Sequence, residues 1–175
     1  MQTSYIITFI GDDRPGLVKQ LSQTIEDNDG NWHDSRLSQL GGKFSGLILV
    51  SLPTANGDAL ELALKGLSAS GLSVRVTPTV DGLGSSDGQD ISLTVLGPDR
   101  KGIVREISHA LAERQINVIE MDSEVISAPM SGELLFQARI KAQIPSSVDV
   151  DNLEDTLEEI ANQMTLDIDL DATSS

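Results

Sequence analysis

The sequence contains no cysteine, which excludes disulfide bonds and thiolate metal sites. Its only histidines are His33 and His109, and no carboxylate cluster has a recognisable ligand spacing, so a catalytic zinc site would lack its usual ligands. No apolar run approaches the roughly 20 residues that span a bilayer. The amino terminus also lacks the basic-then-apolar pattern of a signal peptide. We therefore expect a cytoplasmic protein without a metal, a cofactor or a membrane partner.

Basic residues are scarce as well. The chain has 12 lysines and arginines against 27 aspartates and glutamates, and its formal net charge is -15. Proteins that bind DNA or RNA gain most of their affinity from basic side chains that neutralise phosphates. Direct binding to nucleic acid is therefore not expected.

One stretch of the chain occurs twice. Gly11-Asp12-Asp13-Arg14-Pro15-Gly16-Leu17-Val18 returns as Gly97-Pro98-Asp99-Arg100-Lys101-Gly102-Ile103-Val104. Each copy follows an apolar run of period two and precedes an apolar pattern of helical spacing, so each is predicted to be a turn from a strand into a helix. The repeat predicts two domains, residues 1–80 and 91–171. Between them, residues 81–90 are rich in glycine and serine and are expected to form a flexible linker.

The elements of the first half follow from periodicity and from turn residues. We expect a strand at 4–10, a helix that starts near Pro15, a strand at 31–40, a hairpin turn at 41–42 and a strand at 44–52. The run from Leu47 to Val50 is apolar on both faces, which indicates that the sheet face opposite the helices is covered by the other half of the chain or by a second subunit. Asn56 or Asp58 can cap a second helix, and a last strand follows at 72–76.

The second half repeats this order, with a longer and half-exposed strand after its hairpin and a final helix from Val150 to Met164. The predicted fold class is α+β. It consists of two ferredoxin-like βαββαβ domains in tandem, each with an antiparallel sheet and two helices on one face.

The repeated turn has the chemistry of a site for a free amino acid. Unpaired backbone N–H groups at the start of a helix attract a carboxylate, and the glycines let it approach the main chain. Asp13 and Asp99 can accept hydrogen bonds from an ammonium group, while Asn31 and Asn117 offer both a donor and an acceptor. A second interpretation is that these aspartates only cap the helices, since aspartate is strongly preferred at that position.

The pattern Gly-x-Asp-Arg-x-Gly-[Leu/Ile]-Val after a strand, with asparagine opening the next strand, resembles the ACT domain family of small regulatory modules. The run from Asn31 to Leu37, continuing to Leu40 and Gly41, resembles more particularly the glycine cleavage system transcriptional repressors, a family of stand-alone tandem ACT proteins. ACT domains bind amino acids where two domains meet. The resemblance therefore implies ten ligand-binding residues: Asp12, Asp13, Arg14, Pro15, Gly16, Asn31, Asp99, Arg100, Gly102 and Asn117.

The resemblance implies a non-enzymatic regulator that responds to a small amino acid such as glycine. It would repress expression of the glycine cleavage system by binding a transcriptional activator protein, and it could form a homodimer through its sheet or helix faces. One alternative is a regulatory or dimerisation subunit that binds a metabolic enzyme, and another is a dimerisation module with empty sites. No catalytic residue is expected, because His33 and Asp34 are neighbours on a strand and point to opposite faces.

Overall fold

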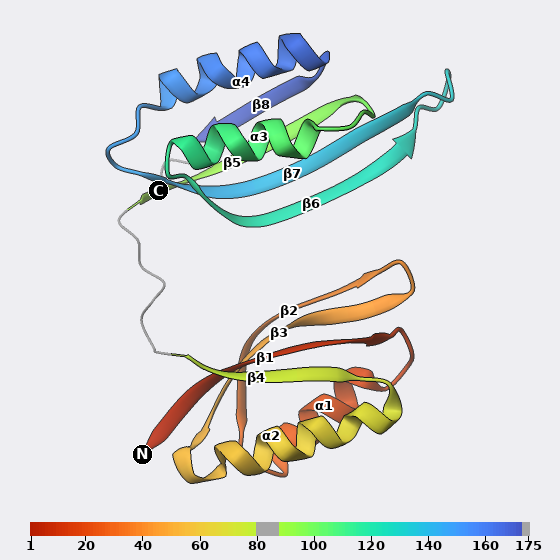
Figure 1. Ribbon diagram of the computed structural model, residues 1–175, viewed down its shortest axis with the longest axis vertical. Coiled ribbons are helices and arrows are strands. Elements are labelled where there is room, and N and C mark those ends of the chain that lie inside the picture. Colours follow the sequence, from red (N-terminus) through yellow and green to blue (C-terminus); the bar gives the residue numbers. More distant parts are fainter. Residues whose placement is uncertain (80–87, 173–175) are drawn as a thin grey trace. The chain divides into compact units, whose positions relative to one another are not determined.

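The structure, a computed structural model, describes residues 1–79 and 88–172, which belong to two compact units (Figure 1). The first unit contains β1 (Gln2–Asp12), α1 (Leu17–Glu26), β2 (Asn31–Leu40), β3 (Lys43–Pro53), α2 (Gly57–Gly66) and β4 (Ser73–Thr79). Short 3-10 turns flank α2 at Thr54–Asn56 (η1) and Leu67–Ser70 (η2). The sheet order is β2-β3-β1-β4, and every neighbouring pair is antiparallel.

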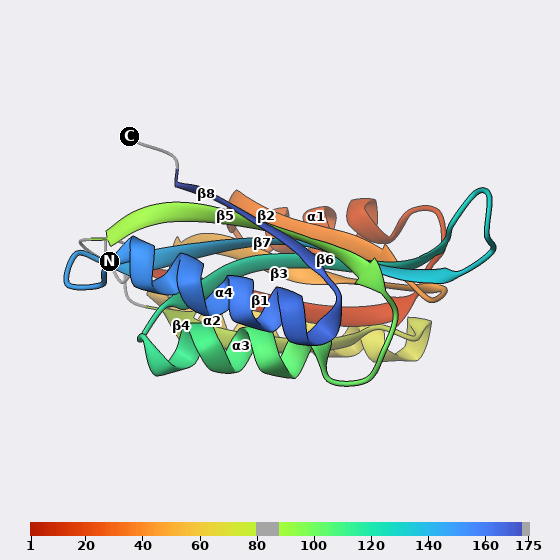
Figure 2. The same ribbon diagram turned by 90° about the horizontal axis from the view of Figure 1, so that it is seen from above.

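The second unit repeats the first. It contains β5 (Gly88–Pro98), α3 (Ile103–Glu113), β6 (Asn117–Ser127), β7 (Leu134–Pro145), α4 (Val150–Met164) and β8 (Asp167–Ala172), and the sheet order is β6-β7-β5-β8. Figure 2 shows α3 and α4 running side by side over this sheet, where Arg114 donates hydrogen bonds to Asn152 and Thr156. The predicted tandem of ferredoxin-like βαββαβ domains is confirmed.

The expected linker falls mostly on residues 81–87, which lie outside the described part of the chain. Its last three residues, Gly88 to Asp90, belong to β5, because their backbones pair with the end of β7. Strand pairing thus begins three residues earlier than the apolar pattern indicates.

Each unit has a core between one face of its sheet and its two helices. In the first unit, Leu17, Leu21 and Ile25 form the buried side of α1 and pack among buried residues of the sheet such as Ile7 and Ile48. Burying a side chain of this size contributes about 1.5–3 kcal/mol. The helical spacing of these residues and the two-residue spacing of the strands explain why α1 packs on one face of the sheet, and right-handed crossovers place α2 on the same face.

Only one face of β3 is buried by its own unit, and the expected cover of the other face, by the second half of the chain or by a second subunit, stays a prediction. Ile48, Val50 and Leu52 are buried, but Leu47 is 49% exposed. A continuous apolar run does not distinguish a strand with two buried faces from one whose second face is open. In this strand, the side chains alternate between the core and the face away from the helices.

Both repeated turns end in a glycine that precedes the helix with left-handed backbone angles. The φ angle is +92° at Gly16 and +99° at Gly102, and neither helix has a side-chain cap. The helix consequently begins at Leu17 and not at Pro15, which lies in the turn.

The sequence led us to expect that Asn56 or Asp58 caps α2. The side chain of Asn56 makes no capping hydrogen bond to the helix and instead donates to Asn28 O and Asp29 Oδ2.

We predict that Gly16→Ala lowers the free energy of unfolding of the first unit by about 1–2 kcal/mol, because an L-residue is disfavoured in the left-handed region. Gly66→Ala is the matched control, since Gly66 has helical angles and a Cβ there would meet no atom within 4 Å. The control should be neutral or stabilising. Urea denaturation followed by the fluorescence of Trp32, the only tryptophan of the chain, reports on this unit. Equal effects of the two substitutions would contradict the backbone argument.

Candidate functional site

The two repeated turns lie open at the surface. Nine of the ten residues proposed for ligand binding are exposed, and Gly102 is half-buried. A Cβ built on Gly16 or on Gly102 would meet no atom within 4 Å. The first N–H groups of α1 and α3 have no partner in the helix, because the first helical bonds reach only Gly16 O and Gly102 O from Gln20 and Glu106. With respect to residues 1–79 and 88–172, each turn therefore presents free amides at the positive end of a helix.

The aspartates of these turns do not cap the helices. The position before each helix is held by glycine, and no side chain accepts a hydrogen bond from the first turn. Instead, the backbone N–H groups of Asp13 and Asp99 donate to Gly42 O at 3.0 Å and Leu134 O at 2.8 Å, which ties each turn to the neighbouring hairpin. Within the described residues, neither carboxylate has a partner, so both are available to a cation. The capping interpretation is thus wrong.

In the first turn the other charged side chains are engaged by the protein. Lys43 forms an exposed salt bridge with Asp12, and this hydrogen bond, together with the charge of the ammonium group, lowers the pKa of the Asp12 carboxyl below its usual value. Arg14 donates to Gln20 Oε1 at 3.1 Å and to Ser70 O at 3.3 Å. Asp12 and Arg14 therefore connect the turn to β3 and to the segment after α2.

The second turn lacks these connections. Pro98 stands where the first copy has Asp12, and the side chains of Arg100 and Lys101 have no hydrogen-bond or ion-pair partner among residues 1–79 and 88–172. Two free cations thus lie beside the free amides of α3. The duplicated turns share their backbone geometry but differ in the charge that they offer to a ligand.

The asparagines lie far from the turn of their own unit. Asp12 pairs with Lys43 at one end of β3, and Asn31 pairs with Ser51 near its other end. In the second unit, Pro98 pairs with Leu135 and Asn117 pairs with Gln143. Eight residues of strand separate the two positions in each unit, which corresponds to about 26 Å. An amino acid as small as glycine cannot contact both positions in one unit.

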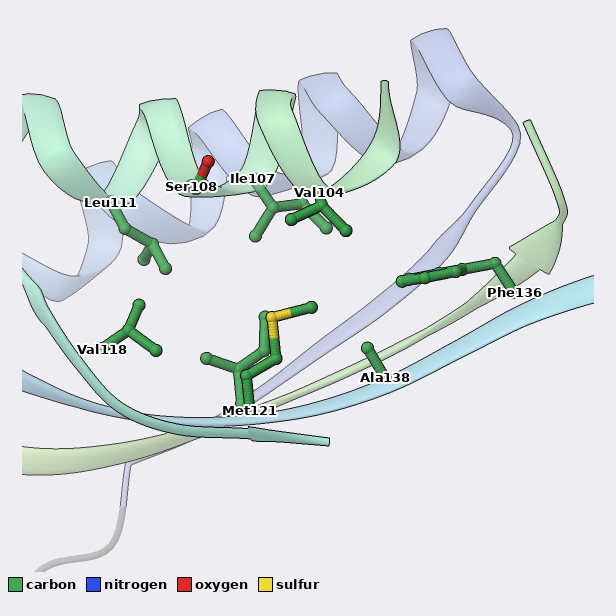
Figure 3. Close-up of a pocket in the computed structure, with 9 residues that line it drawn as sticks. Val104, Ile107, Ser108, Leu111, Val118, Met121, Phe136 and Ala138 are labelled. Atoms are coloured by element: carbon green, nitrogen blue, oxygen red, sulfur yellow. The ribbon is translucent and has the colours of Figure 1, made fainter. Parts of the chain in front are cut away.

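An apolar hollow lies between α3 and the strands β6 and β7 of the second unit. Figure 3 shows Met121 and Phe136 on the strand side facing Val104, Ile107 and Leu111 of the helix. Only about 20 Å³ of space in the hollow can be reached by a water molecule, and Ser108 is the only polar residue in its lining. Such a surface cannot pair the charges of a zwitterion, so the hollow does not fit a free amino acid.

Residues 1–79 and 88–172 contain neither a metal-binding cluster nor a membrane-spanning helix. No group of three or more His, Asp or Glu side chains there could hold a metal ion. None of the described helices is long and apolar enough to cross a membrane.

Sequence reasoning missed Lys43, Gln20 and Ser70, which hold the first turn in place. Lys43 could have been found, because it follows the hairpin turn at Gly41 and Gly42 and lies beside the end of β1 if β3 pairs with β1. Ser70 is distant in sequence and polar, and no local pattern relates it to the turn.

Comparisons with known proteins agree with this fold. Two family models described as ACT domain match residues 3–77 and 91–163. The crystal structure of an unknown protein from Galdieria sulphuraria is 28% identical, covers 99% of this chain and 100% of its own, and has a TM-score of 0.89. That of a candidate glycine cleavage system transcriptional repressor is 20% identical, covers 100% of this chain and 99% of its own, and has a TM-score of 0.74. No curated protein matches the chain significantly.

We predict that Lys43→Gln raises the pKa of Asp12 towards its ordinary value, because the substitution removes the ammonium group that stabilises the carboxylate. The pKa of Asp12 is lowered in the folded state, so the pair stabilises the fold above the unfolded-state pKa, and this contribution disappears as the pH falls through the folded-state pKa. Carboxyl NMR titration measures the shift. Lys19→Gln, a change on α1, is the control and should leave Asp12 unaltered. An unchanged Asp12 titration in Lys43→Gln would show that the pair does not form in solution.

Proposed function

The chain belongs to the ACT domain family, with two such domains in tandem, and we propose that it is a non-enzymatic, cytoplasmic regulator that responds to a small amino acid such as glycine. The observation that carries the proposal is the duplicated open turn. Each copy combines free helix N–H groups with a carboxylate that has no partner among the described residues. These groups complement the carboxylate and the ammonium of one zwitterion.

The turn supplies one half of the proposed site. The ligand carboxylate accepts hydrogen bonds from the first amides of α1 or α3, and its ammonium group donates to Asp13 or Asp99. In the second turn, Arg100 adds positive charge near the ligand carboxylate. Asp12, Arg14 and Pro15 act by fixing the shape of the first turn, since two of them are engaged in contacts with the protein.

The other half of the site comes from an ACT domain of a second molecule. Asn31 and Asn117 are about 26 Å from the turns of their own units, too far for a shared small ligand. Their amide groups can donate to and accept from a ligand that is bound to a turn across an interface. We therefore propose that the ligand-bound protein is a homodimer.

We propose that the output is repression of glycine cleavage system expression through binding to a transcriptional activator protein. Similarity to a candidate repressor of that system over the full chain supports this assignment, as does the sequence run from Asn31 to Leu37. The net charge of -15 supports binding to a protein rather than to DNA.

We predict that isothermal titration calorimetry detects binding of glycine or another small amino acid to the protein. Asp13→Ala together with Asp99→Ala should weaken this binding at least about tenfold. A hydrogen bond to a charged group contributes about 1.5–3 kcal/mol, and 1.4 kcal/mol corresponds to a factor of ten. Asn31→Ala together with Asn117→Ala should have a similar effect. Asp27→Ala is the control, because Asp27 is an exposed aspartate at the opposite end of α1. If glycine, serine and the branched-chain amino acids all fail to bind at millimolar concentration, the sensing role is wrong.

We also predict that the protein alone does not shift glycine cleavage operator DNA in a gel assay, whereas it alters the complex of that DNA with its activator when glycine is added. The double aspartate variant should lose the response to glycine and keep the fold. A shift caused by the protein alone would contradict the electrostatic argument. Affinity capture of a metabolic enzyme, without binding to the activator, would support the alternative of an enzyme-associated subunit.

A further inference from the structure

The sheet face away from the helices is apolar at its centre in the first unit. Strand alternation places Ile6, Thr8 and Ile10 of β1 beside Leu47 and Leu49 of β3 on this side. Ile10 is 50% exposed and Leu47 is 49% exposed. We call this surface face A and include in it the side chains of the two edge strands that point the same way.

Arginines flank the apolar centre of face A on both edges. The strand register places Arg36 of β2 opposite Leu47, Leu47 opposite Thr8, and Thr8 opposite Arg75 of β4. Directly paired residues of antiparallel strands share a face, so these four side chains form one row across the sheet. Both arginines are exposed, and neither forms a salt bridge with a described carboxylate. Face A therefore carries unpaired positive charge on an acidic protein.

The corresponding face of the second unit has the opposite charge pattern. We call it face B, and its edges are lined by six acidic residues, three on β6 and three on β8: Glu120, Asp122, Glu124, Asp167, Asp169 and Asp171. One row runs from Asp122 through Arg139 and Thr94 to Asp169, so carboxylates flank the sheet where face A has arginines.

The wider charge distribution agrees with this contrast. Residues 88–172 contain 17 acidic and six basic side chains, whereas residues 1–79 contain eight and six. One of the two cations at the centre of face B also has a partner on its edge, since Lys141 bridges to Glu120 at 3.2 Å. The alkyl stems of Lys141 and Arg139 can cover an apolar surface while their charged ends reach the acidic edge.

We propose that face A of one molecule docks on face B of a second copy, and that the two copies do so reciprocally. Sheets stack face to face about 10 Å apart, which lets the edges of face A meet the edges of face B. Arg36 and Arg75 then lie over rows of carboxylates, while the apolar centre of face A covers the stems of the central cations. Pairing of face B with itself would place carboxylates against carboxylates, and pairing of face A with itself would bring arginines together.

The size of the two faces fits a stable complex. Strand spacing and rise give each four-stranded face a planar area of roughly 500 Å². A reciprocal dimer covers two such faces on each copy, which exceeds the ~800 Å² per partner of a standard interface. Reciprocal contacts also close the assembly at two copies, whereas a one-way contact would continue into a filament. The inference does not depend on amino-acid binding.

The first test compares the wild type with the charge reversal Arg36→Glu together with Arg75→Glu by sedimentation velocity over a wide range of protein concentration. The wild type should dimerise, and the variant should dissociate at least about tenfold more readily. Lys19→Glu together with Lys65→Glu is the matched control, since it changes the net charge equally on helices of the same unit. Circular dichroism verifies that each variant is folded. If the charge-reversal variant does not fold, Arg36→Gln together with Arg75→Gln removes the positive charges without introducing negative ones and serves in its place.

The second test asks whether two charge-reversed variants, each unable to dimerise alone, restore dimerisation when they are mixed. Asp122→Arg together with Asp169→Arg reverses face B, and this variant should be monomeric alone, like the reversal of face A. A mixture of the two variants should form a dimer, because the two reversed faces complement each other and the two unaltered faces still pair. A monomeric wild type at every concentration, a dimer unaffected by the arginine reversal, or a mixture that remains monomeric would each overturn the proposal.

Discussion

Each sheet of this protein can bury only one face, because both helices of a βαββαβ unit lie on the same side (Figure 1). The buried face supplies the whole core of each unit, and no buried side chain among the described residues is polar or charged. Groups capable of recognition therefore lie outside this core, and they include the ends of the helices and the open face of the sheet. The repeated turn and the charged rows of the sheets occupy these two positions.

The fold could be predicted because the apolar residues recur with a clear helical period in some segments and with a period of two, typical of strands, in others. Leu17, Leu21 and Ile25 mark one side of a helix, and the alternation along β7 marks one side of a strand. The start of α1 could not be predicted from spacing, because Pro15 fits a first helical turn as well as it fits the turn before Gly16. The exposure of Leu47 depends on what lies beyond the sheet, which an apolar run does not encode.

The repeated turns were also found from sequence, since duplication separates them from an ordinary loop. Placing Asn31 beside Asp13 was the weaker step. A helix that connects two strands of one sheet returns the chain to the end where the first strand began, so the second strand starts opposite the turn. Topology alone could therefore have predicted the separation, whereas the contact of Arg14 with Ser70 required the packed structure.

The distance between each turn and the asparagine of its own unit also affects how the protein would respond in a cell. If a ligand is held by groups from two molecules, its binding and their association are thermodynamically linked, and each strengthens the other by mass action. The half-saturating amino-acid concentration would then fall as the protein becomes more abundant. Expression level would thus set the threshold at which the metabolite is detected.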